Sequence, residues 1–141
     1  MKIKLNAIEE SVKDKRVVLI DDSIVRGTTS GRIVKLLRDA GAKEIHMRIS
    51  SPPFLNPCYY GTDIDSKENL IACKHSVEEI AEMIGADTLG YLPVSELDSL
   101  IGNCDYCSAC FDGVYPTAIP KDTRKNRFEQ KLSEKNRAKD K

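Results

Sequence analysis

The chain has 141 residues, of which 40% are hydrophobic, and its formal net charge is zero. This length suits a single domain with a buried core. No apolar run approaches the ~20 residues of a membrane span, and the N-terminus is too short and too acidic for a signal peptide. We therefore expect a cytoplasmic protein with no membrane partner.

The first strong pattern is the run of four apolar residues at 17–20, three of which are β-branched. Such a run is typical of a parallel strand that is buried on both faces. Two adjacent carboxylates, Asp21 and Asp22, follow the strand. A helical pattern then runs from residue 29 to residue 40, and Gly41 is expected to end that helix.

The segment between this strand and this helix has the composition of an anion-binding loop. Backbone N–H groups at a helix start point at a common position and attract negative charge. Asp21 and Asp22 lie at the carboxyl end of the strand, where α/β sheets bind ligands. Their oxygens can accept hydrogen bonds from sugar hydroxyls or hold Mg²⁺. The loop adds a flexible glycine, three hydroxyl groups and a positive charge, from Gly27, Ser23, Thr28, Thr29 and Arg26.

A second strand follows the first helix. Apolar residues alternate at Ile45, Met47 and Ile49, which predicts a strand parallel to the first one. The next segment, SPPFLNPCYYG at 51–61, holds three prolines. Because proline breaks both helices and ladders, this segment is expected to be irregular, and Cys58 is expected to lie on a loop.

Two further helices and a third strand are predicted beyond this loop. Ser76 and Glu79 form a capping-box pattern at the start of a helix that ends at Gly85. Residues 88–92 read as a short strand. A short helix is expected to begin at Ser95, with Asp98 as its capping partner, and to end at Gly102.

Three of the five cysteines, Cys104, Cys107 and Cys110, have the spacing C-x2-C-x2-C in a compact loop at 104–110. In a cytoplasmic protein this clustering favours metal or redox chemistry over a disulfide framework. The spacing is found in zinc knuckles and in iron–sulfur loops and does not choose between them. Ordinary loop and core thiols are the remaining interpretation.

The last part of the chain differs in composition. Residues 121–141 carry nine Lys/Arg and four Asp/Glu, a net charge of +5, so the preceding residues carry −5. Phe128 and Leu132 are the large apolar residues of this segment, and a disordered or solvated tail is expected. We therefore divide the chain into a domain at 1–120 and a charged tail at 121–141, and we expect no nucleic-acid partner.

Residues 17–29, VVLIDDSIVRGTT, closely resemble the phosphoribosyl-pyrophosphate (PRPP) motif of type I phosphoribosyltransferases. The resemblance extends from about residue 4 to residue 120. It implies an α/β fold: a type I phosphoribosyltransferase-like parallel sheet flanked by helices, present as a partial domain, with a cysteine-bearing C-terminal loop region. Three more segments are similar to the C-terminal part of the amidophosphoribosyltransferase family: SPPFLNPCYYGTDI (51–64), HSVEEIAEMIGADTLGYL (75–92) and CSACFDGVYP (107–116).

The resemblance also implies site residues, none of them catalytic. The substrate-binding set is Asp21, Asp22, Ser23, Ile24, Val25, Arg26, Gly27, Thr28 and Thr29. Asp21 and Asp22 are expected to hold the ribose hydroxyls and Mg²⁺, and the rest of the loop the 5′-phosphate. Family members with a [4Fe–4S] cluster have three ligands that match Cys58, Cys107 and Cys110. Their fourth ligand belongs to sequence upstream of Met1, so Cys104, or less directly Cys73, is left as a substitute.

The implied function is the C-terminal part of an enzyme that forms 5-phosphoribosylamine from PRPP and glutamine-derived ammonia, the first committed step of purine biosynthesis. Purine nucleotides are further expected ligands, and the intact enzyme is expected to be a homo-oligomer. The family's glutaminase half uses an amino-terminal cysteine, and no cysteine precedes Cys58, so the chain alone is expected to be inactive. Two alternatives are a non-catalytic PRPP- or nucleotide-binding module and another type I phosphoribosyltransferase that acts on a base.

Overall fold

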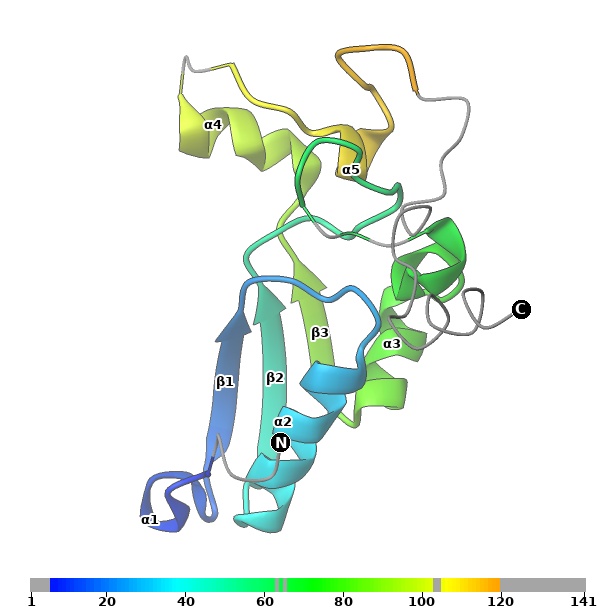
Figure 1. Cartoon of the computed structure of the whole chain (residues 1–141). Coiled ribbons are helices and arrows are strands. Elements are labelled where there is room, and N and C mark those ends of the chain that lie inside the picture. The colour runs from blue at the N-terminus through cyan, green and yellow to red at the C-terminus, as the bar shows by residue number, and fades with distance from the viewer. Residues whose placement is uncertain (1–5, 63, 65, 103–104, 120–141) are drawn as a thin grey trace, which may run out of the picture.

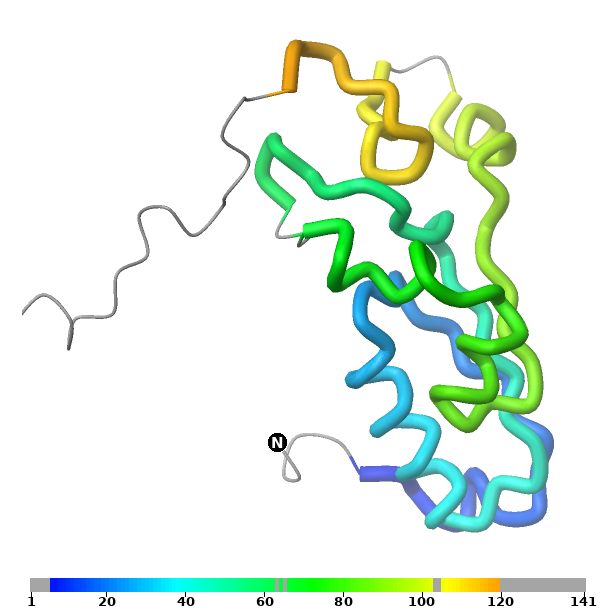
Figure 2. Tube along the Cα trace, turned by 90° about the vertical axis from the view of Figure 1, so that its right-hand side faces the viewer, coloured from blue at the N-terminus to red at the C-terminus, as the bar shows by residue number. Residues whose placement is uncertain are grey.

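The computed structural model describes residues 6–62, 64, 66–102 and 105–119. Its centre is a three-stranded parallel sheet in the order β1-β2-β3. The strands are β1 (Arg16–Asp21), β2 (Glu44–Ile49) and β3 (Thr88–Tyr91). Two helices, α2 (Thr28–Asp39) and α3 (Val77–Ile84), lie on one side of the sheet (Figures 1 and 2). The predicted parallel sheet flanked by helices is confirmed.

Shorter elements complete the described part. Helix α1 (Glu9–Val12) precedes the sheet, and α4 (Leu97–Ile101) and α5 (Ala109–Asp112) follow it. Single 3₁₀ turns occupy Lys67–Asn69, Ile71–Cys73 and Val94–Glu96. No helix in these ranges is long and apolar enough to cross a membrane. The predicted tail lies outside the described residues.

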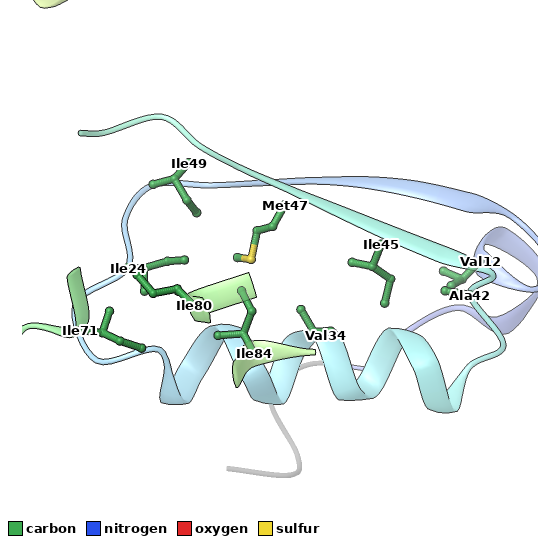
Figure 3. Close-up of a cluster of buried hydrophobic side chains, with 10 residues drawn as sticks. All are labelled: Val12, Ile24, Val34, Ala42, Ile45, Met47, Ile49, Ile71, Ile80 and Ile84. Carbon is green, nitrogen blue, oxygen red and sulfur yellow. The ribbon is translucent and has the colours of Figure 1, made fainter. Parts of the chain in front are cut away.

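The main core lies between the sheet and the two helices. Because side chains of a strand alternate between its faces, Ile45, Met47 and Ile49 of β2 all point to this side, and their exposed fractions are 0%, 0% and 3%. Val34 of α2 meets them from the helix layer (Figure 3). The remaining buried members are Val12, Ile24, Ala42, Ile71, Ile80 and Ile84.

One prediction about β1 is wrong. The apolar run predicts a buried parallel strand, but Val18 and Ile20 are 62% and 73% exposed. Val17 and Leu19 alternate with them and pack on the core. Both long helices cover the face of Val17 and Leu19, and the described residues place no segment over the other face (Figure 2).

Helix α2 begins at Thr28, one residue before its predicted start, and ends at Asp39, two residues before Gly41. Gly41 has a φ of +88°, the left-handed conformation that glycine adopts without strain. Its N–H donates to the Arg38 carbonyl at 2.9 Å, and the Ala42 N–H donates to the Leu37 carbonyl at 3.0 Å. These two bonds make the glycine-ended cap that the sequence predicts.

The capping box of α3 is confirmed. The Glu79 N–H donates to Ser76 Oγ at 3.2 Å, and the Ser76 N–H donates to Glu79 Oε2 at 2.7 Å. The predicted start of the next helix at Ser95 is wrong. A 3₁₀ turn occupies that position, and α4 begins at Leu97 without a side-chain cap. Its predicted end at Gly102 is confirmed.

Candidate functional site

The loop between β1 and α2 is fixed at its middle. Ile24 turns inward and is 2% exposed within the main core. The next residue, Val25, accepts a hydrogen bond at its carbonyl from the Ile71 N–H at 2.9 Å. The polar residues before and after Ile24 therefore remain at the surface on a loop that the core holds in place.

Asp21 and Asp22 lie at the carboxyl end of β1. The Asp22 N–H donates to Asp21 Oδ1 at 3.0 Å, and the Ser23 hydroxyl donates to Asp22 Oδ1 at 3.2 Å. The residue after β2 also holds Asp21 in place, because the Ser50 N–H and hydroxyl donate to the Asp21 carbonyl at 3.0 and 3.2 Å. Within the ranges described, no lysine, arginine or histidine forms an ion pair with either carboxylate.

The far end of the loop is the start of α2. Gly27 has a φ of +78°, and a Cβ there would lie 3.0 Å from Ile71 Cδ1, so both conformation and space favour glycine. No side-chain hydrogen bond caps this helix start, and no acidic residue lies in its first turn. Thr28 and Thr29 are exposed beside it. Uncapped N–H groups with hydroxyls nearby suit a bound phosphate.

The loop thus has two chemically different ends. Asp21 and Asp22 can accept hydrogen bonds from hydroxyl groups or bind a hard cation such as Mg²⁺, and the start of α2 can hold an anion. The side chains of Ile24 and Val25, both in the expected substrate-binding set, pack on the two hydrophobic clusters. At these two positions, main-chain groups are what a ligand can contact.

Sequence reasoning missed two supporting residues. Ser50 holds the Asp21 carbonyl, and Ile71 both binds the Val25 carbonyl and packs beside Gly27. Ser50 directly follows the second strand, and strand ends gather at one edge of a parallel sheet, so its position offered a signal. Ile71 belongs to a 3₁₀ turn about forty residues after Gly27, and no pattern links the two.

The expected cluster ligands lie in a second region, which we call the cysteine lobe, consisting of residues 51–61 and 105–119 (top of Figure 1). The N–H groups of Leu55 and Asn56 both donate to the Cys110 carbonyl at 3.0 Å. The rings of Phe54 and Phe111 stack with centroids 5.1 Å apart. Two segments about fifty residues apart in sequence are therefore joined.

The pKa values of two thiols in this lobe are shifted in opposite directions. Burial raises the pKa of Cys110, and nearby Cys58 and Cys107 raise it further. For Cys58 burial also acts upward, but hydrogen bonds from backbone groups of Tyr60, Thr62 and Gly61 outweigh it and lower the pKa. Cys58 Sγ accepts from the Tyr60 N–H at 3.5 Å. The lobe thus brings Cys58, Cys107 and Cys110 into one electrostatic neighbourhood.

That neighbourhood is not a formed metal site. In the part of the chain that the structure describes, no group of three or more His, Cys, Asp or Glu side chains is arranged to hold a metal ion. Cys104 lies outside the described residues. Cys73 packs against this region, and its thiol donates to the Leu55 carbonyl at 3.2 Å. Among the described residues, the cysteines therefore do not form a cluster site.

The predicted compact loop at 104–110 is wrong at its end, because Ala109 and Cys110 belong to α5. This one-turn helix ends at Gly113, which has a φ of +81°. The Ser108 hydroxyl donates to Asp112 Oδ2 at 2.5 Å across this turn. The C-x2-C-x2-C spacing indicates a loop that carries thiols, and it does not indicate this one-turn helix.

Comparisons with known proteins find similar sequences and a similar fold. No protein-family model matches the chain. An amidophosphoribosyltransferase of Bacillus subtilis is 56% identical over an alignment of 129 residues, which covers 87% of this chain and 27% of the relative. The corresponding protein of Archaeoglobus fulgidus is 51% identical, over 85% of this chain and 27% of the relative. This chain therefore spans about a quarter of the length of these curated relatives.

Solved structures give the same result. One is the B. subtilis glutamine PRPP amidotransferase complexed with ADP and GMP, with a TM-score of 0.75 and 55% identity. It matches 83% of this chain, which corresponds to 27% of the solved one. A second, described as the allosteric regulatory enzyme of purine biosynthesis, has a TM-score of 0.76 at 55% identity. Both neighbours contain the described fold as part of a longer chain.

Proposed function

Because this chain corresponds to a segment of amidophosphoribosyltransferases, we propose that it is the PRPP-binding segment of an enzyme that forms 5-phosphoribosylamine from PRPP and ammonia. The observation that carries this proposal is the pairing of two carboxylates with an uncapped helix start on either side of Ile24. A ribose 5-phosphate presents the complementary groups, hydroxyls at one end and a phosphate at the other. The similarity to purine-synthesis enzymes supports the choice of PRPP.

In this proposal the residues of the loop position the substrate. Asp21 and Asp22 accept hydrogen bonds from the ribose hydroxyls, and the N–H groups at Thr28 and Thr29 hold the 5′-phosphate. With both ends held, C1 is presented to the incoming ammonia in a fixed orientation. Bound Mg²⁺, for which Asp21 and Asp22 are the proposed ligands, would neutralise charge on the departing pyrophosphate.

The first test is PRPP binding by the chain in the presence of Mg²⁺, measured by calorimetry. Asp21→Asn with Asp22→Asn should weaken binding about 100-fold, the equivalent of about 3 kcal/mol from lost charged hydrogen bonds. Glu78→Gln with Glu82→Gln removes the same charge from exposed positions on α3 and should leave affinity unchanged. Equal affinity in the parent and the Asp21/Asp22 variant would contradict the assignment.

The second test addresses catalysis. Because the chain spans about a quarter of the length of its relatives, we propose that it does not convert PRPP on its own. Grafted in place of the matching segment of the B. subtilis relative, it should restore ammonium-dependent pyrophosphate release from PRPP, and the Asp21/Asp22 variant should not. Pyrophosphate release by the isolated chain would show that the rest of the enzyme is dispensable. Activity of the graft with free purine bases in place of ammonium would favour a different transferase.

Purine nucleotides are proposed as competing ligands of the same loop. A nucleoside monophosphate carries the ribose 5-phosphate that the loop is proposed to hold, and one similar solved structure is a complex with ADP and GMP. GMP should displace PRPP from the parent chain in the calorimetric assay. Displacement that is undiminished in the Asp21/Asp22 variant would place GMP elsewhere.

For the cysteine lobe we propose a [4Fe–4S] cluster held by Cys58, Cys107 and Cys110, with the fourth ligand undetermined. Support comes from the contacts that join the segments carrying these cysteines: the Leu55 and Asn56 N–H groups donate to the Cys110 carbonyl at 3.0 Å, and the Tyr115 hydroxyl donates to the carbonyl of Pro57, beside Cys58, at 2.7 Å. Iron and sulfide are to be measured per chain after anaerobic reconstitution, for the parent, Cys107→Ser and Cys104→Ser. Loss of iron in Cys107→Ser supports the assignment. Stoichiometric zinc without iron, or a cluster unaffected by Cys107→Ser, contradicts it.

A further inference from the structure

The phosphate end of the loop is supported by a residue far along the chain, Ile71. It begins the 3₁₀ turn Ile71–Cys73 and is 7% exposed within the main core (Figure 3). Its N–H donates to the Val25 carbonyl at 2.9 Å. Its side chain lies against Gly27, because a Cβ at that glycine would stand 3.0 Å from Ile71 Cδ1. Ile71 therefore holds the chain at two points immediately before α2 begins.

The turn that carries Ile71 is itself fixed on its far side. The N–H groups of Lys74 and His75 both donate to the Ile71 carbonyl at 3.1 Å. Leu70, which directly precedes the turn, is 0% exposed in the cluster around Phe54. Because burial and main-chain bonds hold the turn, Ile71 meets the loop as a rigid support.

The start of α2 has little local support of its own. No side-chain hydrogen bond caps it, and the Gly27 carbonyl accepts the first hydrogen bond of the helix, from the Gly31 N–H at 2.9 Å. The N–H groups of Thr28 and Thr29 have no partner within the helix, because the first N–H groups of any helix have none. Their directions therefore follow the position of the Gly27 peptide.

The contact with Gly27 separates Ile71 from an ordinary core residue. Apart from chain neighbours, two atoms of the described residues lie within 4 Å of the Cβ position at Gly27: Ile71 Cδ1 at 3.0 Å and Ile84 Cγ2 at 3.5 Å. Ile80 is 1% exposed in the same cluster and does not approach that position. A truncation at Ile71 should thus change both stability and the loop, whereas the same truncation at Ile80 should change stability alone.

We propose that Ile71 is a positioning residue for the phosphate end of the loop: its side chain sets the position of Gly27 and so directs the N–H groups of Thr28 and Thr29 at a phosphate monoester. β-Branching and burial restrict the isoleucine side chain, so Cδ1 acts as a spacer of fixed length. A shorter side chain would let Gly27 move, and the two N–H groups would lose their common direction. This role rests on the proposed function and deepens it, because Ile71 determines the affinity for a substrate that it does not touch.

The first test is PRPP binding by the full chain in the presence of Mg²⁺, measured by calorimetry. Ile71→Val removes Cδ1 and leaves the rest of the side chain in place, and it should weaken binding about fivefold, because the N–H groups are no longer held ready for the phosphate. Ile80→Val is the matched control: it removes the same methyl group from the same core, should lose as much stability in urea, and should bind PRPP as the parent does. Equal PRPP affinities of the two variants would overturn the proposal.

A second substitution tests the contact itself. Gly27→Ala should weaken PRPP binding about tenfold or more, because the new Cβ meets Ile71 Cδ1 and because alanine is strained at a φ of +78°. Gly27→Ala with Ile71→Val should bind PRPP about threefold more tightly than Gly27→Ala alone, since the smaller side chain admits the Cβ and only the strain remains. Gly27→Ala with Ile80→Val should show no such recovery. Losses that simply add when Gly27→Ala and Ile71→Val are combined would overturn the proposal.

Inorganic phosphate separates the role of Ile71 from the proposed function. In amide NMR spectra of the parent, added phosphate should shift the Thr28 and Thr29 resonances, and Ile71→Val, but not Ile80→Val, should weaken this binding about fivefold. That result in a chain that binds no PRPP would refute the proposed function and leave the role of Ile71 standing. PRPP binding that is equal in Ile71→Val and Ile80→Val would do the reverse. The absence of any phosphate-induced shift at Thr28 and Thr29 in the parent would overturn the role of Ile71.

Discussion

The α/β unit, made of β1, β2, β3, α2 and α3, and the cysteine lobe are held together in different ways. In the α/β unit, strands and helices present repeating apolar positions, and Ile45 and Met47 are fully buried between them. The cysteine lobe has a smaller cluster around Phe54, and its loops are joined by main-chain bonds to the Cys110 carbonyl. The first region follows from periodic sequence patterns, and the second depends on contacts between distant segments.

The two candidate sites reflect this contrast. The loop at Asp21–Thr29 is attached to the α/β unit at Ile24, so its geometry comes from the core. The three expected cluster ligands rely on contacts between the two segments of the lobe, among them the stacking of Phe54 on Phe111 and the hydrogen bond from the Tyr115 hydroxyl to the Pro57 carbonyl at 2.7 Å. We therefore expect perturbations of the cysteine lobe to reach the loop only through Val25, which packs on the Phe54 cluster, whereas perturbations of the core should affect both sites.

The largest effect should come from the core of the α/β unit. Ile45→Ala removes a side chain that is 0% exposed and should lower the free energy of unfolding by about 4 kcal/mol. Urea denaturation followed by circular dichroism gives the value. Amide exchange should quicken in both regions, because the Phe54 cluster of the lobe packs on Val25, which belongs to the loop that the core holds. If exchange in the lobe stayed as slow as in the parent, the lobe would be an autonomous unit.

A smaller and local effect is expected in the cysteine lobe. Phe54 is 8% exposed and stacks on Phe111, and Phe54→Ala should lower the free energy of unfolding by about 3 kcal/mol. Amide exchange should accelerate at 54–61 and 107–117 while the amides of β2 keep their protection. Phe54→Leu, which retains most of the apolar volume, serves as the control. Faster exchange throughout β2 would show that the two regions unfold together.

The contribution of Asp87 to the stability of the α/β unit should depend on pH. Its Oδ2 accepts from the Ile45 N–H at 2.6 Å and from the Arg38 guanidinium at 2.5 Å, and these contacts hold its pKa below the ordinary value. A lowered carboxyl pKa stabilises the fold above the unfolded pKa of about 4, and this stabilisation is lost as the pH falls through the folded pKa. Because the side chain is about one-third exposed, Asp87→Asn should cost only about 1 kcal/mol at pH 7.

Urea midpoints at several pH values check this prediction. The difference in stability between the parent and Asp87→Asn should be constant from pH 6 to pH 8 and should shrink below about pH 4. A constant difference down to pH 2 would mean that the carboxylate charge does not matter.

The smallest effect concerns the capping box. Ser76→Ala removes the acceptor of the Glu79 N–H and should lower the free energy of unfolding by about 1 kcal/mol. Ser99→Ala is the matched control, since the Ser99 hydroxyl donates to the Glu96 carbonyl and caps no N–H group. If Ser99→Ala lowered the free energy of unfolding as much as Ser76→Ala does, the capping hydrogen bond would make no specific contribution to stability.

Much of the α/β unit was predictable because its signals are local. Ser76 with Glu79 marked a helix start, Gly41 marked a helix end, and the alternation of Ile45, Met47 and Ile49 marked the core face of a strand. Residue types also identified the loop from Asp21 to Thr29. Whether those residues hold PRPP and Mg²⁺ stays a prediction.

What the sequence did not reveal depends on contacts between distant residues. The apolar run of β1 indicated burial on both faces, but Ile20 is exposed because the described helices share one side. Ser50 and Ile71 support the loop across gaps of about thirty and forty residues. Ser95 with Asp98 matches a cap pattern, yet Ser95 itself lies in a 3₁₀ turn. Each of these outcomes requires three-dimensional packing.

The buried position of Ile24 has a consequence for the rates of ligand binding. A loop that must become ordered around its ligand loses conformational entropy on binding, and this loss weakens affinity. Here the core has already fixed the middle of the loop, so the acidic end and the helix end are ordered before any ligand arrives. We expect substitutions of the polar residues to act mainly on the dissociation rate, whereas Ile24→Ala should slow association, because the loop would then have to find its bound form.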